Sequence, residues 1–241
     1  METTNKLYGK TILWNGDSIC AGLPETGSWA TRIAERNAMQ YKNFAVGGGT
    51  VADALPPRRD GKPRHTVTGT LDLMYEEYPN ADYIILEGGT NDADLLGNAT
   101  IEGNKTRLGS FDAHDFGGNY DKTTFCGALE SIFYRATRYW MDKKIGFIVA
   151  QKMFCCTVPD YENRRLYFDR AVEICKKWGI PYIDLWNGCY LNPHLPHMYD
   201  ATKTREENKL ENKGYYYDGQ HLTSRGYDVT AELIETWLKA L

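Results

Sequence analysis

A serine that directly follows a short apolar run is the first residue of this chain whose surroundings suit chemistry. The run Thr11–Asn15 has the composition of a buried strand, and Ser18 comes after it on a turn that Gly16 permits. In open α/β sheets, reactive groups often lie beyond the carboxyl end of a strand. Near the other end of the chain, Asp218 and His221 stand three residues apart, so one turn of backbone can aim both side chains together.

These three residue types are those of nucleophilic catalysis. A serine hydroxyl is a weak nucleophile at neutral pH and needs a base to accept its proton as it attacks an ester carbonyl. His221 is the candidate base for Ser18, because an imidazole exchanges a proton near neutrality. Asp218 would hold the ring in one tautomer and stabilise the charge that it gains. Taken alone, however, Gly-Asp-Ser also suits an ordinary turn in which the serine caps a helix.

Two further stretches favour the chemical interpretation. Asn43–Thr50 ends in three glycines and a threonine, and Glu87–Asp92 reads Glu-Gly-Gly-Thr-Asn-Asp. Together with Gly-Asp-Ser and the Asp-x-x-His pattern, they resemble the four sequence blocks of the SGNH hydrolases. These form the branch of the GDSL esterase/lipase family that is named after its Ser, Gly, Asn and His. The resemblance spans the chain from Gly16 to His221.

The resemblance implies an oxyanion hole, the set of donors that stabilises the charge developing on the attacked carbonyl oxygen. Members of the family build it from the nucleophile's own N–H, a glycine N–H and an asparagine amide. On this sequence those positions are Ser18, Gly48 and Asn91. Gly47 and Gly49 stay open as alternatives to Gly48. The resemblance also implies a mechanism that uses no cofactor and no metal.

Competing motifs are weaker. Gly47–Ala52 fits the dinucleotide pattern GxGxxA, but it follows the second predicted strand and leads into a proline-rich loop instead of a clear helix. Cys20 stands where GxSxG would need its second glycine, which argues against an α/β-hydrolase, and without a base of its own it is expected to pack. No metal site is predicted. The remaining histidines are expected to be surface or hydrogen-bonded core residues: His65, His114, His194 and His197.

Strands and helices alternate along the chain. The strands are predicted at Thr11–Asn15, Tyr41–Val46, Ala81–Leu86, Ile145–Ala150 and Tyr182–Leu185. The helices are predicted at Ser28–Ala38, Leu71–Tyr78, Asp121–Lys143, Tyr161–Trp178 and from Ser224 onward. This alternation predicts an α/β fold, a three-layer α/β/α sandwich with about five parallel strands. The SGNH resemblance implies the same architecture, which is flavodoxin-like.

The length of 241 residues suits a single domain, 1–241. Two long polar stretches, residues 93–119 and 187–217, are expected to be loop insertions near the site. The net charge of −4 gives no reason to expect a nucleic-acid partner, and we expect no insertion into a membrane. The polar N-terminus lacks the pattern of a signal peptide. Six cysteines without a CxxC pair are expected to be buried free thiols, so a cytoplasmic location is predicted.

The sequence therefore predicts a serine esterase for small acyl esters, acetyl esters first, with carbohydrate esters among the candidate substrates. The polar character of the two predicted insertions favours a small or sugar-like substrate over a long acyl chain, which would need an apolar channel. A lysophospholipase or thioesterase of the same family is the alternative enzyme. A glycan-binding module without catalytic activity is the alternative from another class of protein.

Overall fold

The five predicted strands form one sheet. The computed structural model describes residues 5–53, 63–93, 108–155, 157–211 and 213–241. The strands are β1 (Thr11–Asn15), β2 (Gln40–Asn43), β3 (Tyr83–Glu87), β4 (Lys144–Val149) and β5 (Tyr182–Asp184). All pairs are parallel, and the order across the sheet is β2-β1-β3-β4-β5. The predicted five-stranded parallel α/β fold is confirmed.

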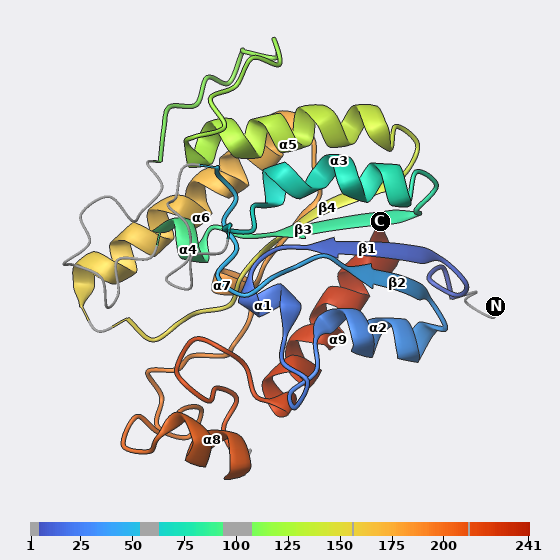
Figure 1. The fold of residues 1–241 in the computed structure, drawn as a ribbon. Helices are drawn as coiled ribbons and strands as arrows, with labels where there is room; N and C mark the ends of the chain where they lie inside the picture. The colour runs from blue at the N-terminus through green and yellow to red at the C-terminus, as the bar shows by residue number, and fades with distance from the viewer. Residues whose placement is uncertain (1–4, 54–62, 94–107, 156, 212) are drawn as a thin grey trace.

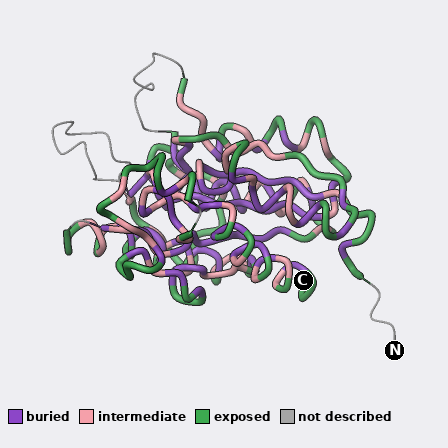
Figure 2. The backbone as a smooth tube through the Cα atoms, turned by 90° about the horizontal axis from the view of Figure 1, so that it is seen from below, coloured by how far each residue is buried: buried purple, intermediate pink, exposed green. Residues whose placement is uncertain are grey.

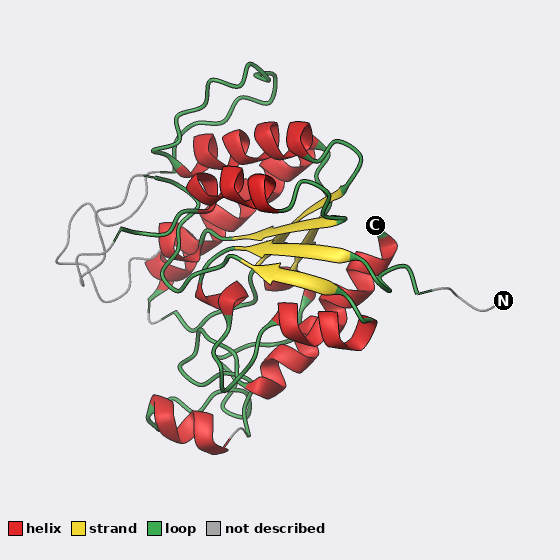
Figure 3. Cartoon of the chain, turned by 45° about the vertical axis from the view of Figure 1, so that its right-hand side comes forward, coloured by secondary structure: helices red, strands yellow, loops and turns green. Residues whose placement is uncertain are grey.

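Helices cover both faces of this sheet and give it three layers (Figures 1 and 3). On one face α2 (Trp29–Asn37) packs against α9 (Ser224–Ala240), and on the other α5 (Phe125–Tyr139) packs against α3 (Val67–Glu77) and α6 (Val158–Trp178). Burial follows the sheet and the inward helix faces (Figure 2). Within the first layer, Trp29 Nε1 donates to Thr230 Oγ1 at 2.8 Å, which joins α2 to α9.

Two helix starts and one strand end differ from the predicted boundaries, and capping side chains explain the two helix starts. The helix predicted at 121–143 begins only at Phe125, because the side chain of Thr124 accepts the N–H of Gly127. The helix predicted from Leu71 begins four residues earlier, after the cap Thr66. The second strand ends at Asn43 instead of Val46, whose N–H donates to the carbonyl of Gly16 at 3.2 Å.

Short helices within the connections have no counterpart in the prediction. They are α1 (Ser18–Ala21), α4 (Thr90–Ala93), α7 (Leu185–Gly188) and α8 (Arg205–Glu211). Helix α8 lies inside the stretch 187–217, which was expected to be loop; in this helix only Asn208 is buried, so no apolar periodicity marks it. Of the other predicted insertion, residues 94–107 lie outside the described residues, and 108–120 form irregular chain.

The register of the central strands brings their carboxyl ends to one edge of the sheet. Asn15 at the end of β1 pairs with Leu86 near the end of β3. Ser18 follows β1 by three residues, and Asn91 follows β3 by four, so both lie beyond this edge. The strand order changes direction between β1 and β3, and such a position is where open α/β sheets bind their ligands.

Candidate active site

The structure brings the three predicted catalytic side chains into one hydrogen-bonded line. His221 Nε2 lies 2.8 Å from Ser18 Oγ, and His221 Nδ1 lies 2.8 Å from Asp218 Oδ2. Ser18 begins α1, whereas the other two residues lie on the loop that precedes α9, about two hundred positions further along the chain. With Nδ1–H donated to the carboxylate, Nε2 presents its lone pair to the serine hydroxyl.

The Asp-x-x-His spacing aligns the two side chains because the aspartate also binds the backbone that leads to the histidine. Asp218 Oδ1 accepts the N–H groups of Gln220 at 3.1 Å and His221 at 2.8 Å, which leaves Oδ2 for the imidazole. Burial alone would raise the pKa of Asp218, but the hydrogen bonds from the His221 side chain and these two N–H groups outweigh it and hold the pKa below its usual range. The carboxylate is therefore ionised at neutral pH.

Two side chains that the sequence reasoning missed surround this pair. The ring of Tyr217 stacks on that of His221, with centroids 5.6 Å apart and planes inclined by 9°. The guanidinium of Arg205, from α8, lies 4.8 Å from the Tyr217 ring centre, and its Nε is 3.7 Å from Asp218 Oδ2. Helix α8 thus contributes a cation beside the acid. The position of Tyr217 next to Asp218 in the sequence was the available signal.

Ser18 is held from both sides. Asp17 caps α1, and its Oδ1 accepts the N–H of Ile19 at 2.8 Å. From α9, Tyr227 Oη donates to the carbonyl of Ile19 at 2.7 Å. In the described part of the chain, the N–H of Ser18 has no hydrogen-bond partner, so it stays available to a ligand.

The predicted oxyanion donors lie around the same edge. Gly48 adopts φ +75°, a conformation that favours glycine, and no partner for its N–H is found among the described residues. The N–H of Gly49 donates to Val46 O at 2.9 Å, so Gly49 is the weaker of the two alternatives to Gly48. Asn91 Nδ2 donates to Gly49 O at 2.8 Å and to Asp17 Oδ2 at 3.3 Å. These contacts fix the amide of Asn91 beside the glycine turn.

The other residues considered in the sequence have structural surroundings. His65 Nε2 lies 3.0 Å from Asn15 Oδ1, and burial lowers the pKa of His65. Burial, with the charges of Glu87 and Asp17, raises the pKa of Cys20 well above its usual value, which keeps the thiol protonated. The cysteines of the described residues are buried free thiols, as predicted. No group of potential metal ligands occurs among the described residues, and none of the described helices is long and apolar enough to cross a membrane.

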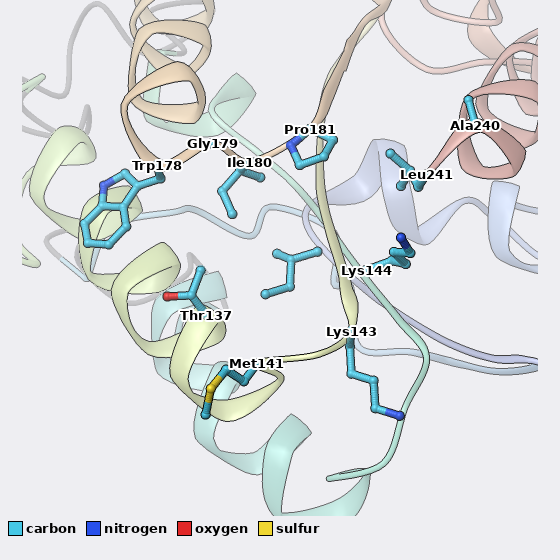
Figure 4. A pocket seen from close by; sticks show the side chains of 11 residues that line it. Thr137, Met141, Lys143, Lys144, Trp178, Gly179, Ile180, Pro181, Ala240 and Leu241 are labelled. Carbon is cyan, nitrogen blue, oxygen red and sulfur yellow. The ribbon is translucent and has the colours of Figure 1, made fainter.

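A hollow of about 390 Å³ lies at the opposite end of the sheet (Figure 4). Its lining includes Lys143 and Lys144 where β4 begins, Pro181 before β5, and the terminal Leu241. This is the amino-terminal edge of the strands, away from Ser18. Since ligands of open α/β sheets bind at the carboxyl edge, the hollow is not part of the candidate active site.

The comparisons with known proteins define the class. The sequence matches the GDSL-like lipase/acylhydrolase family over residues 15–229, so the chain belongs to this family of ester hydrolases. The match begins at Asn15 and includes the Ser18, Gly48, Asn91, Asp218 and His221 positions. A comparison with curated proteins found no match.

Solved structures share the fold over nearly the whole chain. A protein from Lactobacillus plantarum has a TM-score of 0.69 at 20% identity, over 97% of this chain and 98% of that one. A lipase/acylhydrolase from Enterococcus faecalis has a TM-score of 0.59 at 19% identity, over 96% of both chains. A carbohydrate acetylesterase family member from Sinorhizobium meliloti has a TM-score of 0.58 at 14% identity, over 96% of this chain and 98% of that one.

Proposed function

We propose that this chain is a serine esterase that hydrolyses small acyl esters, acetyl esters first, with acetylated carbohydrates as candidate substrates. The observation that carries the proposal is the line from Asp218 through His221 to Ser18, in which both hydrogen bonds are 2.8 Å long. General-base activation of a serine requires this arrangement. Membership of the GDSL-like lipase/acylhydrolase family supports ester hydrolysis as the reaction.

In the proposed mechanism Ser18 Oγ bonds to the ester carbonyl carbon while its proton passes to His221 Nε2. The carbonyl oxygen becomes an oxyanion, which accepts hydrogen bonds from the N–H groups of Ser18 and Gly48 and from the amide of Asn91. Because one N–H of this amide donates to Gly49 O at 2.8 Å, the oxyanion shares the other, which makes the longer 3.3 Å contact with Asp17 Oδ2. The tetrahedral intermediate then breaks its bond to the alcohol oxygen, which takes the proton from Nε2. Water, deprotonated by the same His221, attacks the acyl-enzyme and releases the acid and free Ser18.

The described surroundings of the imidazole support a polar leaving group. The ring of Tyr217 is buried against His221 and offers no face to a ligand, but the guanidinium of Arg205 beside it is half-exposed. Its hydrogen-bond donors suit a polar group such as a sugar better than they suit a long acyl chain. The similarity of the fold to a carbohydrate acetylesterase family member agrees with this substrate class. On these grounds an acetylated sugar is the preferred substrate.

The test is hydrolysis of p-nitrophenyl esters from acetate to octanoate, together with an acetylated monosaccharide, by the wild type and Ser18→Ala. We expect activity on acetate and on the sugar acetate that is lost in Ser18→Ala. A steady rise from acetate to octanoate would favour a lysophospholipase or thioesterase instead. Binding of a glycan without any turnover would favour the non-catalytic module.

A further inference from the structure

Two fully buried carboxyl groups lie together directly behind the proposed nucleophile. Neither Asp17 nor Glu87 has exposed surface, and neither belongs to the catalytic line. Glu87 ends β3, and its Oε2 accepts the N–H of Asp17 at 3.1 Å. The two side chains also interact with each other. Gly16 permits this approach, because a Cβ there would lie 2.6 Å from Glu87 Oε2.

Such a pair holds a proton at neutral pH. Burial penalises a charged carboxylate, and two carboxylates in one buried site repel each other, so one of them stays protonated. Burial raises the pKa of Asp17, against the hydrogen bond from Ile19 and the charges of His221 and Arg164. Burial and then the charge of Asp17 raise the pKa of Glu87 well above its usual value.

The hydrogen bonds indicate which of the two carries the proton. Asp17 uses both oxygens as acceptors, Oδ1 for the N–H of Ile19 and Oδ2 for Asn91 Nδ2. Glu87 Oε1, by contrast, is buried without a hydrogen-bond partner among the described residues. An ionised carboxylate needs donors at both oxygens, whereas a neutral acid needs fewer. The geometry therefore favours an ionised Asp17 beside a neutral Glu87.

We propose that Glu87 is a positioning residue that carries the proton of this pair and thereby keeps Asp17 ionised as the anchor of Ile19 and Asn91. The inference rests on the proposed function, because these anchored groups flank the nucleophile and the oxyanion hole. Ser18 lies between two fixed peptide groups, the N–H of Asp17 held by Glu87 and the N–H of Ile19 held by Asp17. A neutral Glu87 leaves a single negative charge in the pocket.

Two matched amide substitutions distinguish the two assignments of the proton. Glu87→Gln replaces the neutral acid by a neutral amide of the same shape, so the rate at which a fluorophosphonate probe labels Ser18 should stay within a few-fold of wild type. Asp17→Asn removes the anionic acceptor, and we expect labelling to slow by about tenfold or more, since an oxyanion donor is typically worth about 10²–10³ in rate. The opposite order of the two variants, with folding intact, would overturn the proposal.

A second readout does not depend on catalysis. The groups facing Glu87 are Asp17, Cys20 and Tyr227, and burial keeps both the thiol and the phenol neutral by raising their pKa values well above the usual ones. The pKa of Glu87 is higher in the folded than in the unfolded protein, so its stabilising contribution is present at low pH and is lost as pH rises through the folded value. The thermal midpoint of Glu87→Gln, measured relative to that of the wild type, should therefore increase as pH rises.

A difference in thermal midpoint that is constant from mildly acidic to alkaline pH would refute the protonated Glu87. If Glu87→Gln fails to fold, the infrared carbonyl band of a protonated carboxylic acid in the wild type at neutral pH decides the question, and its absence overturns the proposal. The two proposals can also fail separately. If the wild type does not react with the probe but its thermal midpoint still differs from that of Glu87→Gln in the expected pH-dependent way, only the esterase assignment is refuted, because the stability measurement needs no turnover.

Discussion

Replacing Asp218 by asparagine should inactivate the enzyme through the tautomer of His221 and not through its position. Oδ1 of Asp218 accepts two backbone N–H groups, from Gln220 and His221, and only an oxygen can take that place. The variant must therefore turn its amide nitrogen toward Nδ1 of the imidazole, where Oδ2 now accepts a hydrogen bond at 2.8 Å. Because an amide N–H donates, Nδ1 becomes the acceptor and Nε2 carries the proton, so Nε2 cannot deprotonate Ser18.

A triad whose acid becomes an amide loses about 10⁴ in kcat in the best-known serine protease, and we expect a loss of that order here, about 5 kcal/mol of transition-state stabilisation. The assay is steady-state hydrolysis of p-nitrophenyl acetate at neutral pH, with KM measured alongside kcat. The thermal midpoint should change little, since both backbone hydrogen bonds survive. Asp218→Asn with kcat within about tenfold of wild type would show that the carboxylate does not set the tautomer, and the reasoning would fail.

Three other substitutions test separate parts of the structure. Asn91→Ala removes a proposed oxyanion donor, so kcat for p-nitrophenyl acetate should fall by about 10²–10³ with KM little changed; an equal fall in Ser18 labelling is the check, and an unaltered kcat would count against this role. Gly16→Ala places a Cβ 2.6 Å from Glu87 Oε2 and should lower the free energy of unfolding, measured in urea, by about 1–3 kcal/mol. Tyr227→Phe leaves the buried carbonyl of Ile19 without its 2.7 Å donor and should cost about 1–3 kcal/mol in the same assay, whereas an unchanged urea midpoint would contradict it.

The three central strands, β1, β3 and β4, were predictable because burial on both faces makes a continuous apolar signal. Tyr83–Glu87 is buried throughout, and its centre was correctly identified, although the predicted strand ended one residue short of Glu87. The α8 segment gave no such signal, because six of its seven residues are polar and only Asn208 among them is buried. The contribution of Arg205 depends on tertiary placement that composition and periodicity do not encode.

The candidate site likewise contains residues that the sequence predicted and residues that it did not. The Asp-x-x-His spacing indicates a local geometry, so Asp218 and His221 could be predicted to act together, and the family blocks supplied Ser18, Gly48 and Asn91. The roles of these residues stay predictions until they are tested. The position of Glu87 behind Ser18 could not be predicted, because it follows from the pairing of β1 with β3 and from the space that Gly16 leaves. A carboxyl group at the end of an apolar strand was the only signal.

The central claim is that Ser18 is the nucleophile, and the most direct measurement is mass spectrometry of the protein after reaction with a fluorophosphonate probe, followed by peptide mapping. The account predicts one adduct, on Ser18, that is absent from Ser18→Ala and strongly reduced in His221→Ala. An adduct on another residue, or equal labelling of the wild type and Ser18→Ala, would contradict the account.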